Sequence, residues 1–162
     1  MRALSRLDRR LGAAVRHHAD GIPGAPALAH ALASIMSPAF RIVVGALVVA
    51  PATRTTGLRA LAAGAGASLA ARALRDRLGR TRPGERADGG FPSRHAAAAV
   101  AIASAAGRRD PRIRAALAGA AVTGLYARIV DAEHEPADIV VGAALGLATT
   151  RLLERLLPDG LG

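Results

Sequence analysis

Hydrophobic residues along this chain gather into five long segments separated by short polar connections. The segments span residues 27–53, 58–78, 95–107, 113–130 and 137–157. Several are apolar on nearly all sides, and none shows the two-residue alternation of a half-buried strand. The pattern therefore predicts an all-α fold in which residues 27–158 form one domain of about five helices.

A different pattern occupies residues 1–22. Leu4, Leu7, Leu11 and Val15 recur at helical spacing, and arginines stand between them. This is typical of a basic amphipathic helix that lies on a membrane surface, with a solvated surface helix as the alternative. The segment has no continuous apolar core, so we do not expect a signal peptide.

The charge-free centres of the apolar segments are short, at 12 residues each: 42–53, 60–71, 96–107 and 139–150. A membrane span needs about 20 apolar residues, so hydropathy alone leaves a soluble bundle open. Richness in Gly and Ala favours the membrane, because small residues let membrane helices approach closely. An alanine core would also bury little apolar area in a soluble bundle. We therefore predict a membrane-embedded helical bundle of about five spanning helices plus the N-terminal amphipathic helix, multi-pass in the cell membrane.

Composition narrows the function. The 162 residues carry a formal net charge of +10, yet 51% are hydrophobic and 2% aromatic. So few aromatic residues provide no stacking platform for single-stranded nucleic acid, and we predict no nucleic-acid partner. The absence of cysteine excludes disulfides and thiolate metal sites. The chain has arginine but no lysine, and the planar guanidinium group of arginine suits phosphate groups.

Three polar stretches interrupt the apolar pattern. In the first, Arg75 and Arg82 are seven residues apart, so they share a helix face, and Pro83 ends that helix. In the second, Ser93 is a candidate N-cap before Arg94 and His95, at a helix N-terminus that can bind an anion. Taken singly, these residues could instead be interfacial arginines and an ordinary polar helix end.

The third stretch contains Arg128, His134 and Asp138. The i, i+4 spacing of His134 and Asp138 predicts that both face one side of a helix, with Pro136 tolerated only in its first turn. A carboxylate bound to one imidazole nitrogen makes the other more basic, which suits a nucleophile. An acidic loop with an incidental histidine is the alternative. Zinc at His95, His134 and Asp138 is disfavoured by the surrounding arginines, so we predict no metal and no cofactor.

Together the three stretches resemble the signature of the type 2 phosphatidic acid phosphatase superfamily. That signature is Lys, six residues, Arg-Pro; then Pro-Ser-Gly-His; then Ser-Arg, five residues, His, three residues, Asp. The chain matches all three spacings over about residues 56–157. The resemblance implies a metal-independent membrane phosphatase that acts on lipid phosphates, although some soluble relatives are vanadate haloperoxidases.

The resemblance also implies a role for each matching residue. The residues that would bind phosphate are Arg75, Arg82, Ser93, Arg94 (through its backbone N–H) and Arg128. His134 would attack phosphorus to form a phosphohistidine, and Asp138 would orient it. His95 would protonate the leaving alcohol and then activate water.

Three positions depart from the signature, with Arg75 in place of Lys, Arg94 in place of Gly and Ala127 in place of Ser. The arginine variant of the second motif resembles actinobacterial decaprenylphosphoryl-5-phosphoribose phosphatases of cell-wall biosynthesis. A substrate with two phosphates would give Arg94 a second anion to bind. Phosphatidic acid, phosphatidylglycerol phosphate and polyprenyl diphosphate stay open as substrates. A catalytically silent role in binding lipid phosphates also stays open, as does homo-oligomerisation. The side of the membrane on which the site opens is open as well, because arginines are almost equally distributed between the two sides.

Overall fold

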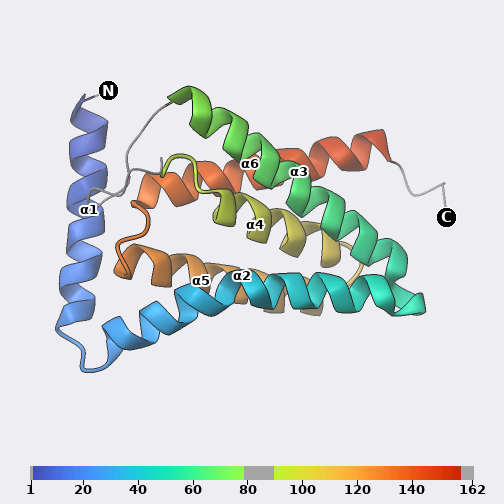
Figure 1. The fold of residues 1–162 in the computed structure, drawn as a ribbon, viewed down its shortest axis with the longest axis horizontal. Helices are drawn as coiled ribbons and strands as arrows, with labels where there is room; N and C mark the ends of the chain where they lie inside the picture. Colours follow the sequence, from blue (N-terminus) through green and yellow to red (C-terminus); the bar gives the residue numbers. More distant parts are fainter. Residues whose placement is uncertain (1, 79–89, 158–162) are drawn as a thin grey trace.

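The computed structural model describes residues 2–78 and 90–157, which form six α-helices and one short 3-10 helix (Figure 1). These are α1 (Arg2–Asp20), α2 (Ala25–Val49), η1 (Pro51–Thr53), α3 (Arg54–Leu78), α4 (Arg94–Ala106), α5 (Pro111–Val130) and α6 (Pro136–Leu156). Each apolar segment corresponds to one of α2 to α6, so the all-α prediction is confirmed. Arg82 lies outside the described residues. The division into domains at 1–22 and 27–158 stays a prediction.

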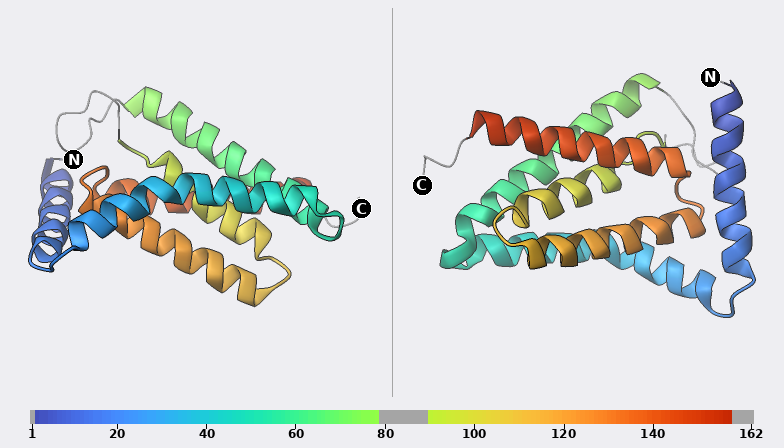
Figure 2. Two further views of the ribbon diagram at one scale, coloured as in Figure 1. Left: turned by 60° about the horizontal axis from the view of Figure 1, so that its bottom comes forward. Right: turned by 180° about the vertical axis from the view of Figure 1, so that it is seen from behind.

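Helices α2 to α6 run back and forth along the long axis of the molecule, whereas α1 crosses one end of this bundle (Figures 1 and 2). At the α1 end, α4 and α6 begin, and α3 and α5 finish. The polar stretches before α4 and α6 therefore meet at this end, although 41 residues separate Ser93 from His134.

Helix α4 is the centre of the bundle and packs against α3, α5 and α6. Its 13 residues extend about 20 Å, which is less than the roughly 30 Å hydrocarbon thickness of a bilayer. Eight of its residues are buried: Ala96, Ala97, Ala99, Ala101, Ile102, Ala103, Ala105 and Ala106. Among the described helices, α2, α5 and α6 are long and apolar enough to span a membrane. Helix α4 is thus an enclosed core helix of the predicted five-helix bundle.

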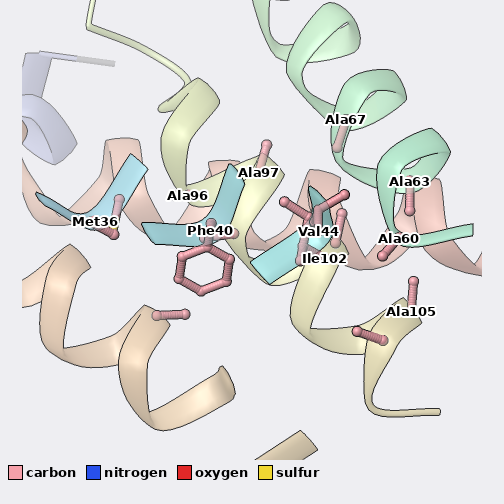
Figure 3. Packing of buried hydrophobic residues seen from close by; sticks show 14 of the residues in the cluster. Met36, Phe40, Val44, Ala60, Ala63, Ala67, Ala96, Ala97, Ile102 and Ala105 are labelled. Carbon is pink, nitrogen blue, oxygen red and sulfur yellow. The ribbon is translucent and has the colours of Figure 1, made fainter. Parts of the chain in front are cut away.

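Small side chains fill the interior of the bundle and large ones face outward, which is the opposite of a soluble protein. The core is mostly alanine (Figure 3), and its larger buried members are Met36, Phe40, Val44, Ile102 and Leu125. Large aliphatic residues instead face outward on every candidate span, among them Leu28, Ile35, Ile42, Val49, Val122, Val140 and Leu152. In water such extensive apolar exposure would drive aggregation, but a bilayer solvates it. The chain is therefore a membrane protein, as the sequence predicts.

Close packing between α4 and α6 depends on two glycines of α6. A Cβ atom at Gly142 would overlap the carbonyl oxygen of Ser93, and one at Gly146 would overlap that of Ala97. The two glycines are four residues apart, the spacing with which small residues bring membrane helices into backbone contact. This contact holds the N-terminus of α4 against that of α6.

Substitution of Gly146 by Ala should destabilise the bundle by about 1–3 kcal/mol, because the added methyl group has only backbone to displace. The thermal midpoint of helix loss in detergent, followed by circular dichroism, measures the effect. Gly119→Ala in α5 is the matched control, since its Cβ would enter open space and alanine favours helix. Equal midpoints for the two variants would contradict the packing argument.

Candidate active site

Ser93 closes the N-terminus of α4 and is fully buried. Its Oγ accepts a hydrogen bond from the backbone N–H of Ala96 at 3.3 Å, which is the predicted N-cap interaction. Its own N–H donates to the carbonyl oxygen of Asp138 at 2.9 Å. Ser93 is therefore bound both to its own helix and to α6.

Arg94 and His95 follow in the first turn of α4. The Arg94 side chain is exposed, whereas that of His95 is half-buried. The His95 ring lies edge-on to the His134 ring, with 6.4 Å between the ring centroids. The second motif therefore brings one imidazole to the other and leaves an arginine side chain at the surface beside them.

Arg128 lies in the last turn of α5 and is almost completely buried. Its Nη2 donates to the carbonyl oxygen of Ala33 in α2 at 3.0 Å, and its Nη1 is paired with the carboxylate of Glu133. The backbone carbonyl of Arg128 accepts bonds from the N–H groups of Glu133 and His134, at 3.0 and 3.2 Å. Arg128 thus organises the turn that carries His134.

The expectation that His134 and Asp138 share a helix face is wrong. Helix α6 begins at Pro136, so His134 lies in the preceding turn and only Asp138 is helical. The cause is the proline, which disfavours helical geometry in the residue before it, and Glu135 is indeed extended. The expectation that Pro136 occupies the first turn is correct.

The same local geometry changes the interpretation of Asp138. Its Oδ2 accepts a hydrogen bond from the backbone N–H of Glu135 at 2.9 Å, and so caps the start of α6. That oxygen lies 3.6 Å from Nδ1 of His134, which is an ion-pair distance and too long for a hydrogen bond. Asp138 therefore shapes the turn directly and acts on His134 as a neighbouring buried charge.

His134 joins the two motifs through its other nitrogen. Nε2 lies 3.1 Å from Oγ of Ser93, and both side chains are buried. Because Ser93 Oγ already accepts from Ala96, its hydroxyl proton is available for Nε2. In the tautomer in which the Ser93 hydroxyl donates to Nε2, this nitrogen carries a lone pair and the ring proton is on Nδ1, next to the Asp138 carboxylate. This is the tautomer that a nucleophilic histidine needs.

The structure thus brings Ser93, His95, His134 and Asp138 together, with Arg128 at the base of the same turn. Arg75 belongs to the last turn of α3, whose C-terminus is at the α1 end of the bundle. A cleft lined by Arg59, Arg108 and Thr150 lies at the opposite end and takes no part in this cluster. Among the described residues, no group of three or more His, Cys, Asp or Glu side chains could hold a metal ion.

Two acidic residues of the site escaped the sequence analysis. Glu133 pairs with Arg128, and Glu135 is buried directly after His134, within 3.4 Å of Arg16 in α1. An acidic residue before Pro136 with Asp138 three residues on is a helix-start pattern, and it could have identified Glu135. Burial raises the pKa of Glu135, helped by the nearby carboxylates of Asp8 and Asp138 and opposed by the charge of Arg16.

Comparison with known proteins adds a family and a fold. The profile of the PAP2 superfamily matches residues 38–159. The chain is also similar to the crystal structure of the first transmembrane PAP2 type phosphatidylglycerolphosphate phosphatase from Bacillus subtilis, with a TM-score of 0.75 and 19% sequence identity over 96% of this chain and 87% of that one. No curated protein matches the chain in sequence.

The raised pKa of Glu135 predicts a pH-dependent stability that Glu135→Gln removes. A carboxyl group whose pKa is higher in the folded state stabilises the fold when protonated, and this contribution is lost as the pH rises through the raised value. Relative to Glu135→Gln, the wild-type thermal midpoint should therefore fall as the pH rises from the ordinary pKa of a glutamate through the raised pKa, and then level off. Parallel midpoint curves for the two proteins would contradict the burial effect.

Proposed function

Because the chain belongs to the PAP2 superfamily, we propose that it is an integral membrane phosphatase that hydrolyses a phosphate monoester or diphosphate of a prenyl or glycerol lipid. The observation that carries the proposal is the buried pair of Ser93 Oγ and His134 Nε2, with Asp138 on one side of the ring and His95 on the other. The cluster lies at one end of the candidate spans, where the phosphate group of a lipid would be.

In the first step, the Nε2 lone pair of His134 attacks phosphorus, and the bond between phosphorus and the ester oxygen breaks. His95 donates a proton to the departing oxygen. The His134 ring becomes positively charged, and the Asp138 carboxylate near Nδ1 stabilises that charge. Phosphorus takes the place that the Ser93 hydroxyl holds at Nε2, and the hydroxyl turns to a phosphoryl oxygen.

Arginines stabilise the charge that builds on the phosphoryl oxygens. Arg75, Arg82 and Arg128 would provide the guanidinium groups, and the backbone N–H of Arg94 is one of the free donors at the start of α4. At Arg128 a phosphoryl oxygen would replace the carboxylate of Glu133, leaving the bond to Ala33 in place. The bond to Ala33 holds the guanidinium in position before the substrate arrives.

In the second step, neutral His95 accepts a proton from water, and the resulting hydroxide attacks the phosphohistidine. The bond between phosphorus and Nε2 breaks, inorganic phosphate leaves, and His134 regains its lone pair. Every proton in this sequence moves through a side chain of the chain itself, so the proposed mechanism uses no metal and no cofactor.

Arg94 bears on the identity of the substrate. Its exposed side chain begins α4 directly beside His95, where the family signature has glycine. A second anionic group on the substrate would meet this cation, which favours decaprenylphosphoryl-5-phosphoribose, and with it a role in cell-wall synthesis at the plasma membrane. Phosphatidylglycerol phosphate, named for the Bacillus subtilis protein of the same fold, and polyprenyl diphosphate also fit a site that takes two anions.

The mechanism predicts phosphate release that survives EDTA, is inhibited by orthovanadate and disappears in His134→Ala. We would measure inorganic phosphate from phosphatidic acid, polyprenyl diphosphate and the phosphoribosyl lipid in detergent. The loss of both nucleophile and intermediate should reduce kcat by about 10⁴-fold or more. A folded wild-type protein that binds these lipids but releases nothing would instead indicate the silent binding protein of the same fold.

Arg94→Gly, which restores the glycine of the family signature, should affect kcat/KM differently for substrates with and without a second anionic group. We expect kcat/KM to fall about tenfold for a lipid with a second anionic group, because one charge-assisted contact is lost. Phosphatidic acid should be hydrolysed by this variant at least as fast as by the wild type. An equal fall in kcat/KM for both substrates would show that Arg94 does not recognise a second anionic group.

A further inference from the structure

Helix α1 turns Asp8, Gly12 and Arg16 toward the bundle, whereas Leu7 and Leu11 face away from it. Asp8 and Gly12 are buried and Arg16 is half-buried, so positions four residues apart form the inner face. Leu7 and Leu11 are 56% and 51% exposed. A surface helix of a soluble protein does the opposite, because burial of its apolar stripe is what holds it in place. We therefore expect Leu7 and Leu11 to contact an apolar surface that is not part of this chain.

The inner face of α1 contacts the turn that carries His134. Oδ1 of Asp8 accepts a hydrogen bond at 2.8 Å from the backbone N–H of Ala137, a group in the first turn of α6 that has no partner within its own helix. Arg16 lies 3.4 Å from the carboxylate of Glu135 and 3.4 Å from the carbonyl oxygen of Ile129. Helix α1 thus bridges the end of α5 and the start of α6, on either side of His134.

Gly12 faces the end of the Glu135 side chain directly. A Cβ atom at Gly12 would overlap Oε2 of Glu135 and would lie 3.1 Å from Nη1 of Arg16. A methyl group at residue 12 would therefore force the end of the Glu135 side chain to shift from its present position beside Arg16. Glu135 directly follows His134, so a shift of its carboxylate away from Arg16 would release one of the contacts that hold the turn of the nucleophile.

The placement of α1 identifies what covers its leucines. It crosses the end of the bundle, whereas the candidate spans α2, α5 and α6 run along the long axis (Figures 1 and 2). With those helices across a bilayer, α1 lies along its surface, where leucines enter the acyl boundary. Arg9 and Arg10 are exposed on the same helix, and their charge is complementary to anionic lipid.

We propose that α1 is a clamp, docked on an anionic lipid surface, that holds the His134 turn in its reactive position through Asp8, Gly12 and Arg16. The inference rests on the proposed function. Asp8, Arg16 and Glu135 act as positioning residues, because they hold the turn rather than the phosphoryl group. Lipid contact at Leu7 and Leu11 fixes α1, and α1 in turn fixes the nucleophile.

The first test compares Gly12→Ala with Gly45→Ala, a control in α2 whose Cβ would enter open space. Both changes favour helix, so neither should lower stability through helix propensity. In vesicles with phosphatidic acid as substrate, Gly12→Ala should reduce kcat severalfold with little change in KM, because the methyl group displaces the Glu135 carboxylate from Arg16 and loosens the turn that positions the nucleophile. Gly45→Ala should match the wild type, and equal kcat for both variants would overturn the clamp.

A double-variant cycle distinguishes the contact from a general structural effect. Removal of the Glu135 side chain also removes the overlap, so Gly12→Ala combined with Glu135→Ala should have the kcat of Glu135→Ala alone. Additive losses would show that Gly12 acts independently of Glu135 and would overturn the proposal. Amide hydrogen exchange over residues 131–137 provides a readout that needs no activity. It should accelerate in Gly12→Ala and not in Gly45→Ala.

The lipid requirement is tested with Leu7→Ser/Leu11→Ser, with Ala13→Ser/Ala14→Ser at exposed positions of the same helix as the control. Wild-type kcat should be higher in vesicles that contain phosphatidylglycerol than in pure phosphatidylcholine, and only the leucine variant should lose this difference. No lipid dependence in the wild type would overturn the docking. If wild type and His134→Ala both fail to release phosphate, the proposed function is wrong. Hydrogen exchange over residues 131–137 then still tests whether α1 holds the His134 turn.

Discussion

Backbone contact between α4 and α6 is the constraint on which this molecule depends. Gly142 and Gly146 leave room for the carbonyl groups of Ser93 and Ala97, and the N–H of Ser93 reaches the carbonyl of Asp138. Because the starts of the two helices are held together, a serine and a histidine far apart in sequence come within hydrogen-bonding distance. Larger residues at the two glycines would separate the helices and, with them, the two halves of the site.

The membrane environment explains why such a contact can hold the bundle together. In lipid, large aliphatic side chains gain nothing by being buried, so the helices associate through close packing of small residues. The alanine core and the outward leucines, isoleucines and valines follow from this, as does a 13-residue helix enclosed by longer ones. The outer residues match the bilayer, and the inner ones determine how closely the backbones approach.

At the α1 end, burial makes each charged side chain depend on a partner. Arg128 has Glu133 and the carbonyl of Ala33, and Glu135 has Arg16. These pairs keep the site folded and, in the proposed mechanism, hold in place the groups that a phosphate would engage. Asp138 serves in both respects, since it caps α6 and places negative charge beside His134.

Sequence by itself determined the features that depend on neighbouring residues. The extents of the helices, the N-cap at Ser93 and the position of Pro136 in a first turn follow from local periodicity and backbone geometry, and the three motifs identified the family. Tertiary structure alone decided that His134 lies beside Ser93, that Glu135 meets Arg16, and that α1 turns Asp8 and Gly12 inward. The physical reason is distance along the chain. The bond between Asp8 and Ala137 joins residues 129 positions apart, and no local pattern records which surfaces meet when the helices pack.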